Sequence, residues 1–171
     1  MQNIIFIHGL ESSGDGFKGL LLRTALPGCL TPNFTPYTPQ ISIRILLKER
    51  MNQLIPILMK KVKWIIIGSS FGGLMSVLYA CQNPKKVSKL ILLAPYLPTS
   101  EINPKDYSPI NIPVIIFHGK HDKIASIKQS RSCVEKLFTN FTYNIVDDKH
   151  HLHKTVKTLD WKKVIESVNI K

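Results

Sequence analysis

The feature that most restricts the fold of this chain is a series of short, almost uninterrupted apolar runs, separated by segments with helical spacing. The runs cover residues 4–8, 62–67, 90–94, 114–118 and 142–146, with a weaker candidate at 29–34. Uninterrupted apolar runs are typical of strands that are buried on both faces, and alternation with helices is typical of parallel sheets. The sequence therefore predicts an α/β fold of about six mostly parallel strands with helices on both faces.

Apolar residues at helical spacing fill the segments between these runs. The expected helices cover residues 17–26, 41–61, 74–81, 127–138 and 155–168. The second of them contains Pro56, where we expect a bend. No linker, repeat or low-complexity tract interrupts the series, so the 171 residues predict a single domain over 1–171.

The charge balance of the chain is strongly basic. Lys and Arg total 23 against 11 Asp and Glu, which gives a formal net charge of +12. Such an excess suits an anionic partner, for example nucleic acid, a membrane surface or an acidic substrate. The basic residues are nevertheless scattered over helix ends and polar faces, without aromatic interleaving or a nucleic-acid-binding motif. We therefore expect a solvated basic surface and no nucleic-acid partner.

The chain shows no targeting or membrane signal. Residues 1–3 lack the positive charge of a signal peptide and lead directly into the first apolar run. No apolar run approaches the roughly 18 residues that a membrane span requires. Cys29, Cys81 and Cys133 are widely spaced and form no C-x-x-C pair. Reduced thiols and a cytoplasmic location are the expectation.

A G-x-S-x-G motif follows the run at 62–67 directly. Gly68-Ser69-Ser70-Phe71-Gly72 lies where a strand turns sharply into a helix, and such a turn exposes the serine hydroxyl at the edge of the sheet. A Cβ at Gly68 or Gly72 would collide with the neighbouring strand or helix. Glycine and serine also occur in strand–helix turns without catalytic function, but the rest of the chain favours Ser70 as a nucleophile.

Candidate partners for this serine follow two later strands. Asp122 comes shortly after the run at 114–118, and a carboxylate there could orient a histidine. His150 and His151 follow the last run, and either could act as the general base. Glu101 or Asp106 could supply the acid from the preceding loop.

The loop after the first run is the candidate for an oxyanion hole. In a serine hydrolase, a loop after an early strand donates one backbone N–H to the oxyanion. We expect this donor to be Leu10, paired with the N–H of Phe71 beside the nucleophile. Gly9 allows the turn, and His8 is expected to brace the loop.

With these motifs, the chain resembles the short, lid-poor α/β-hydrolase-fold esterases and thioesterases of bacteria. The resemblance rests on residues 7–13, 67–73 and 113–122. The order Ser70, Asp122, His150 is that of the family's catalytic triad, and aligning Leu152 with the family's leucine favours His150 over His151. The resemblance implies a minimal α/β-hydrolase fold that cleaves carboxylic esters or thioesters through an acyl-enzyme, without a cofactor.

The connection over residues 95–111 is too short for the helical cap domain of many relatives, so we expect an open site. Tyr96, Leu97 and Tyr107 are candidate walls of the acyl site, although ordinary loop packing explains them equally well. An uncapped site favours short or medium acyl chains. Three lysines beside the catalytic loops suggest tolerance of anionic leaving groups such as coenzyme A: Lys120, Lys123 and Lys149.

Other functions are weighed against this one. Residues 14–19 satisfy G-x-G-x-x-G, but the motif starts well after the strand and no acidic residue lies between Asp15 and Glu49 to bind a ribose. Six histidines could suggest zinc, but their spacing fits no standard metal motif, and we expect no metal. They are His8, His118, His121, His150, His151 and His153. A catalytically silent relative that acts as a binding module remains the alternative.

Overall fold

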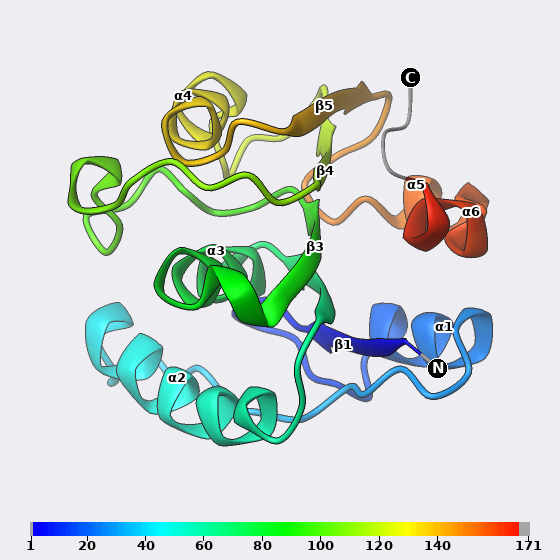
Figure 1. Ribbon diagram of the computed structural model, residues 1–171, viewed down its shortest axis with the longest axis horizontal. Helices are drawn as coiled ribbons and strands as arrows, with labels where there is room; N and C mark the ends of the chain where they lie inside the picture. Colours follow the sequence, from blue (N-terminus) through cyan, green and yellow to red (C-terminus); the bar gives the residue numbers. More distant parts are fainter. Residues whose placement is uncertain (1, 168–171) are drawn as a thin grey trace.

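A five-stranded sheet forms the centre of the computed structural model, which describes residues 2–167 (Figure 1). Its strands are β1 (Asn3–Ile7), β2 (Trp64–Ser69), β3 (Val87–Leu93), β4 (Val114–Gly119) and β5 (Phe141–Val146). They lie side by side in chain order, and each neighbouring pair is parallel. The five clear strands and the parallel sheet that the sequence predicts are confirmed.

Helices cover both faces of this sheet, as Figure 1 shows. One face carries α2 (Ile43–Met59), α3 (Phe71–Gln82) and α4 (Ile127–Leu137). The other face carries α1 (Phe17–Ala25), α5 (His153–Thr158) and α6 (Trp161–Glu166). Two short 3-10 turns complete the elements, η1 (Pro84–Lys86) and η2 (Pro104–Asp106).

The strands are apolar without interruption because each face of the sheet has its own core. In β1, Ile5 and Ile7 pack with the helices of one face, whereas Ile4 and Phe6 pack with those of the other. Burying one such side chain contributes about 1.5–3 kcal/mol. Packing on both faces holds the strands in place, and with them the loops that follow.

The weak strand expected at residues 29–34 is reduced to a single bridge. Leu30 pairs with Ile5 at the free edge of β1, with hydrogen bonds from Phe6 N to Leu30 O (2.8 Å) and from Leu30 N to Ile4 O (2.9 Å). Pro32 follows two residues later and has no N–H to continue a ladder. The described residues therefore contain five strands, not six.

The closing helix expected over 155–168 is divided into α5 and α6, and Val168 lies outside the described residues. The division falls at Asp160, whose carboxylate accepts a hydrogen bond from the N–H of Lys163 and caps α6. Pro56 lies within α2, which continues to Met59.

The connection from β3 to β4 contains only the 3-10 turn η2 and no helical cap. The carboxyl ends of parallel strands share one edge of a sheet, and ligands of open α/β sheets bind beyond that edge. This edge of the molecule is therefore open above the loops that follow the strands. Within residues 2–167, none of the helices is both long and apolar enough to span a membrane.

Candidate active site

Ser70 occupies the sharp turn between β2 and α3. Its backbone has φ 53° and ψ −114°, a conformation that residues other than glycine rarely adopt. The turn is held by hydrogen bonds from Ser70 N to Leu93 O and from the N–H groups of Gly73, Leu74 and Tyr96 to Ser70 O. The strained serine is thus fixed by backbone contacts on both sides.

The two glycines of the motif are required by close packing. A Cβ on Gly68 would lie 2.3 Å from Ser76 Oγ in α3, and one on Gly72 would lie 2.0 Å from Ile7 O in β1. The helix and the strands approach so closely that neither position accepts a side chain without movement of the backbone. This agrees with the reason that the sequence suggests.

A chain of hydrogen bonds links Ser70, His150 and Asp122. His150 Nε2 lies 2.8 Å from Ser70 Oγ, and His150 Nδ1 lies 2.7 Å from Asp122 Oδ2. The Asp122 carboxylate fixes the proton on Nδ1, so that Nε2 can accept the proton of the serine hydroxyl. Three loops, which follow β2, β4 and β5, bring these groups together.

The side chain of Asp122 is completely buried, and its carboxylate accepts several hydrogen bonds. Oδ1 accepts hydrogen bonds from the N–H groups of Ile124 (2.8 Å) and Ala125 (2.9 Å). Burial alone would raise the pKa of this carboxyl, but the hydrogen bonds from Ala125, His150 and Ile124 hold it below its ordinary value. The carboxylate therefore stays ionised beside His150.

The alternative base and acids lie in other positions. The ring of His151 is beside that of His150, with centroids 5.7 Å apart, and makes no hydrogen bond to Ser70. Glu101 pairs with Arg44, and Asp106 accepts a hydrogen bond from Asn103.

His118 is a second histidine on Asp122, and the sequence gives it no specific role. Its Nε2 lies 3.0 Å from Asp122 Oδ2 and 3.1 Å from Ala125 O, two acceptors that require a proton on this nitrogen. Its Nδ1 then accepts from the hydroxyl of Tyr143 at 2.7 Å. Burial lowers the pKa of this histidine, which favours the neutral form. Its one sequence signal is its place four residues before Asp122, at the end of an apolar run.

The expected oxyanion donors, Leu10 and Phe71, both line the cavity that contains Ser70. The loop after β1 runs beside the serine, since a Cβ on Gly9 would lie 3.5 Å from Ser70 Cβ. Within residues 2–167, neither Leu10 N nor Phe71 N donates to a protein acceptor. Both N–H groups are therefore available to a ligand.

The cavity has a volume of about 590 Å³, and Ser70 and His150 lie in its wall. Of the three side chains expected to bound the acyl site, Tyr96 lines it, whereas Leu97 and Tyr107 do not. Leu97 is buried in the core on the α3 face of the sheet, and Tyr107 packs against the same core. The loop after β3 turns Leu97 inward, so the expected roles of Leu97 and Tyr107 do not agree with their positions.

The lysine on the cavity wall is Lys18, at the start of α1. Lys120, Lys123 and Lys149, which the sequence suggests for this role, are exposed and do not line the cavity. Burial lowers the pKa of Lys18 to about 8, against the opposing effect of the charge on Asp148. At neutral pH the cavity therefore contains a half-buried cation.

The glycine motif at 14–19 sets the position of α1. A Cβ on Gly19 would lie 1.8 Å from Gly14 O, and one on Gly14 would lie 2.0 Å from Thr31 O. The loop is folded tightly on the first turn of the helix, and Phe17 and Lys18 thereby reach the cavity wall. Close packing accounts for these glycines without a dinucleotide.

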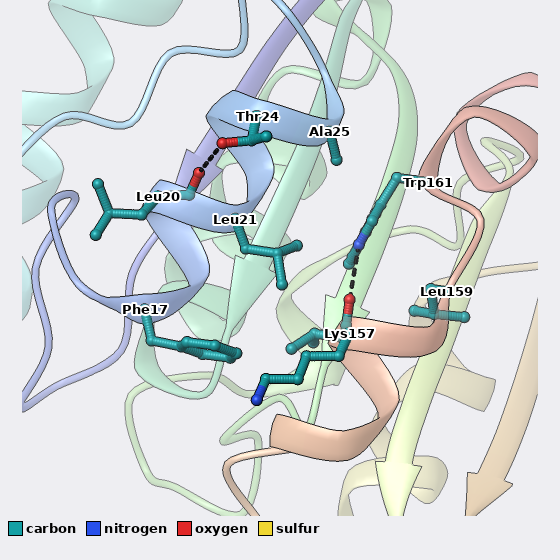
Figure 2. Close-up of a pocket in the computed structure, with 9 residues that line it drawn as sticks. Phe17, Leu20, Leu21, Thr24, Ala25, Lys157, Leu159 and Trp161 are labelled. Carbon is teal, nitrogen blue, oxygen red and sulfur yellow. Dashed lines mark hydrogen bonds between the residues drawn. The ribbon is translucent and has the colours of Figure 1, made fainter.

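A second, shallower groove of about 490 Å³ lies between α1 and the pair α5–α6 (Figure 2). Figure 2 shows Phe17, Leu21 and Trp161 around it, and the Trp161 indole donates to Val156 O at 2.9 Å. Phe17 borders both cavities. The groove is apolar apart from Thr24 and Lys157, and none of the residues that line it is a serine, cysteine or histidine.

In the part of the chain that the structure describes, no three side chains of His, Cys, Asp or Glu are grouped so that they could hold a metal ion. His121 pairs with Asp147 at the surface (2.8 Å), and His150 is committed to Ser70 and Asp122.

Comparisons with known proteins agree with this architecture. The family model described as "Alpha/beta hydrolase family" matches residues 34–155. No curated protein matches the sequence.

Many solved structures are similar to the chain. Est1E from Butyrivibrio proteoclasticus, solved with ferulic acid bound, is 15% identical, with 97% of this chain and 89% of that chain covered and a TM-score of 0.75. A carboxylesterase from Bacillus cereus is 17% identical over 96% of this chain and 86% of that chain, with a TM-score of 0.69. Alpha/beta hydrolase domain-containing protein 10 from mouse is 19% identical over 96% and 90%, with a TM-score of 0.71. At these identities the similarity concerns the fold alone.

Proposed function

The chain belongs to the alpha/beta hydrolase family, with five parallel strands and no cap domain, and from this premise we propose that it is a serine hydrolase of carboxylic esters or thioesters. In this proposal Ser70 is the nucleophile, His150 the general base and Asp122 the acid that orients the base. Leu10 and Phe71 supply the oxyanion hole through their backbone N–H groups.

The observation that carries the proposal is the hydrogen-bonded series from Ser70 Oγ through His150 to Asp122. Its two distances, 2.8 Å and 2.7 Å, are those of a base in contact with its nucleophile and with its orienting acid. The strained backbone of Ser70 adds support, because such conformations are concentrated at functional sites.

Acylation begins when Ser70 Oγ attacks the acyl carbon and His150 Nε2 takes the hydroxyl proton. The Asp122 carboxylate stabilises the imidazolium that results. Charge develops on the former carbonyl oxygen, and the N–H groups of Leu10 and Phe71 donate to it. When the C–O or C–S bond breaks, the imidazolium gives its proton to the departing alcohol or thiol.

Deacylation repeats these steps with water. His150 takes a proton from the water molecule as its oxygen attacks the acyl-enzyme, and the same two N–H groups hold the second oxyanion. The proton returns to Ser70 Oγ, and the carboxylic acid leaves. No cofactor takes part in this sequence.

The substrates we propose have short or medium acyl chains and can contain an anionic group. The cavity is open, of moderate size and bordered by Tyr96, because no cap domain extends it. Lys18 offers a positive charge on its wall, which suits a carboxylate or a phosphate of the substrate. Two of the structural neighbours are consistent with ester chemistry, one named a carboxylesterase and one solved with ferulic acid bound.

Hydrolysis of 4-nitrophenyl acetate, butyrate and octanoate by wild type and Ser70→Ala tests this function. We expect wild-type turnover on the acetate and butyrate, and a loss of about 10⁴-fold or more in kcat for the variant. The variant should unfold at the same temperature as wild type. A parallel series with acyl-coenzyme A thioesters measures the preference between the two leaving groups.

A fluorophosphonate probe separates this function from the alternative of a silent binding module. The probe labels only an activated serine, so it should label wild type and not Ser70→Ala. Wild-type protein that hydrolyses none of the esters or thioesters and resists the probe would support the binding module instead.

A further inference from the structure

One of the two arginines of α2, Arg50, is completely buried against the loop that follows β1. Its Nη1 donates to Gly9 O (3.1 Å), its Nη2 to Leu10 O (2.9 Å) and its Nε to Thr35 O (2.8 Å). Burial lowers the pKa of this guanidinium to about 10, so it remains a cation at neutral pH. Among residues 2–167, no carboxylate forms an ion pair with it.

A buried charge without a counter-ion is costly, so these contacts need an explanation beyond packing. The carbonyl groups of Gly9, Leu10 and Thr35 are the hydrogen-bond partners of the cation. Two of the three belong to the expected oxyanion loop. The guanidinium carbon also lies 5.5 Å from the ring centroid of Phe71, the residue that supplies the second N–H.

The contact with Gly9 O determines where the N–H of Leu10 points. The described residues contain no cis peptide bond, and in a trans peptide the C=O and the following N–H point in opposite directions. Gly9 O faces Arg50 and also His8 Nδ1, at 2.9 Å. The N–H of Leu10 therefore points away from Arg50, and Leu10 lies with Ser70 in the wall of the cavity.

His8 supports the same peptide from a second side. Its Nε2 accepts a hydrogen bond from Phe34 N at 3.2 Å, which leaves the proton on Nδ1, the nitrogen that faces Gly9 O. Burial, with a smaller effect of the Arg50 charge, lowers the pKa of His8 and favours this neutral form. Gly9 O thus accepts two hydrogen bonds, and the orientation of its peptide is fixed.

We propose that Arg50 is a positioning residue for the oxyanion hole, which holds the Gly9–Leu10 peptide so that its N–H faces the oxyanion formed at Ser70. This role rests on the proposed serine hydrolase function. The charge-assisted bond to Gly9 O also polarises the peptide, which makes Leu10 N–H a stronger donor. A cation close to Gly9 and Phe71 further favours the negative charge of the transition state.

Arg50→Met and Arg50→Lys test this role on 4-nitrophenyl butyrate. We expect kcat to fall by about 10- to 100-fold in the Met variant, less than the loss of an oxyanion donor itself, with KM within about twofold of wild type. The Lys variant keeps the charge, but its ammonium group cannot reach all three carbonyl groups as the guanidinium does. Its kcat should therefore lie between that of wild type and that of the Met variant. Leu54→Val is the matched control, because Leu54 is equally buried on α2 but has no polar group that could hydrogen-bond to the loop. It should lose stability and keep kcat.

Butylboronic acid gives a second readout, because its tetrahedral adduct with Ser70 imitates the oxyanion. Its inhibition constant should rise in each Arg50 variant by the factor by which kcat/KM falls. In wild-type protein, the NMR signals of Leu10 N–H and Arg50 Nε–H should both shift when the boronic acid binds. This last measurement decides the question if neither variant folds.

Two results would overturn the proposal: folded Arg50 variants with kcat within twofold of wild type, or a boronate adduct that leaves the Arg50 signal unmoved. Either result would leave the serine hydrolase function intact, since wild type would still turn over the ester. Failure of that function is a different outcome, in which wild type shows neither turnover nor fluorophosphonate labelling.

Discussion

Three of the four positive φ angles at non-glycine residues in the described part of the chain lie around the candidate site. Ser70 (53°) follows β2, Ala94 (45°) follows β3, and Leu152 (52°) lies two residues after His150, whereas Lys63 (61°) directly precedes β2. Such conformations cost of order 1–3 kcal/mol each and persist only where the surroundings fix them. Here the surroundings do so through backbone hydrogen bonds, for example from Ala94 N to Phe117 O. At the scale of single residues, the molecule therefore concentrates conformational strain at the edge of the sheet where the reacting groups lie.

Replacing Ser70 with glycine should reveal the strain at this position. Both Ser70→Gly and Ser70→Ala lose the nucleophile, but glycine adopts a positive φ without steric conflict. We expect the free energy of unfolding of the Gly variant to exceed that of the Ala variant by about 1 kcal/mol, the relief of strain less the entropic cost of glycine. Urea denaturation of the two variants measures this difference. Equal stabilities would mean that the relief of strain is no larger than the entropic cost of glycine, about 0.5–1 kcal/mol.

At the scale of elements, α1 helps to form the wall of the cavity, a role that the G-x-G-x-x-G motif at its start does not predict. The glycine loop at 14–19 draws the start of this helix close to the loop after β1, and Phe17 and Lys18 thereby enter the cavity wall. The element that in another fold would hold a dinucleotide here supplies an apolar ring and a cation beside the serine. The preference for anionic substrates that we propose would therefore depend on α1.

Lys18→Met should reduce the preference for anionic esters. We expect kcat/KM for mono-4-nitrophenyl succinate to fall by about 5- to 10-fold, and that for neutral 4-nitrophenyl butyrate to change less than twofold, since only the anionic ester gains from a charge in a partly desolvated cavity. The pKa of Lys18 is lowered to about 8, so in wild type the advantage of the anionic ester should be present below pH 8 and lost above it.

The matched control is Lys149→Met, which removes an exposed lysine outside the cavity. It should leave the ratio of the two esters unchanged at physiological ionic strength, because surface charges are screened there. If both lysine variants lowered the ratio equally, the preference would come from the overall charge of the protein and not from Lys18.

The elements that sequence predicts well are those whose burial is uniform. Continuous apolar runs predict the five strands because both faces of the sheet are covered. The prediction is wrong at Leu30, where a proline two residues later prevents a ladder, and the cap at Asp160 divides the closing helix although its apolar period continues. In both places a local backbone requirement overrides the hydrophobic pattern.

In the candidate site, the sequence predicts the residues that belong to local motifs but not those that support them from elsewhere in the chain. Ser70, Asp122 and His150 are predictable because each follows a strand in a recognisable motif. Arg50 is not, because an arginine in an amphipathic helix is usually exposed, and its partner Leu10 lies 40 residues away in the chain. His118 is hidden in the same way within an apolar run. Supporting residues of this kind are defined by contacts distant in sequence, which local patterns do not contain.

At the scale of the whole molecule, most of the positive charge lies on the surface, whereas two histidines next to the site are buried and uncharged. The formal net charge of +12 is carried largely by exposed lysines, whereas two histidines next to the site are buried. His8 and His118 both have pKa values lowered chiefly by burial from the ordinary 6.5. The folded state thus holds these rings neutral at a pH where the unfolded chain would protonate them.

The free energy of unfolding should therefore decrease as the pH falls from 7 to 5. Below pH 6.5 the unfolded chain binds more protons than the folded protein, which costs up to about 1.4 kcal/mol per pH unit for each histidine. His118→Gln should show a shallower dependence than wild type in urea denaturation. Stability that is constant between pH 7 and 5 would contradict buried neutral histidines. Added salt should raise stability at pH 5 by screening repulsion among the lysines, but it should not remove the slope.

The order of the strands also bears on how the protein is made. Because β1 to β5 lie in the sheet in the order of their synthesis, a chain leaving the ribosome can add each strand to an existing edge, without waiting for a later one to be inserted. Ser70 and the oxyanion loop emerge early, whereas His150 follows β5 and emerges last of the triad. A nascent chain whose part outside the ribosome ends just before residue 150 would therefore carry a largely assembled sheet with a silent serine, and fluorophosphonate reactivity would appear only with the final loop. Reactivity of this serine would then time the completion of the fold during translation.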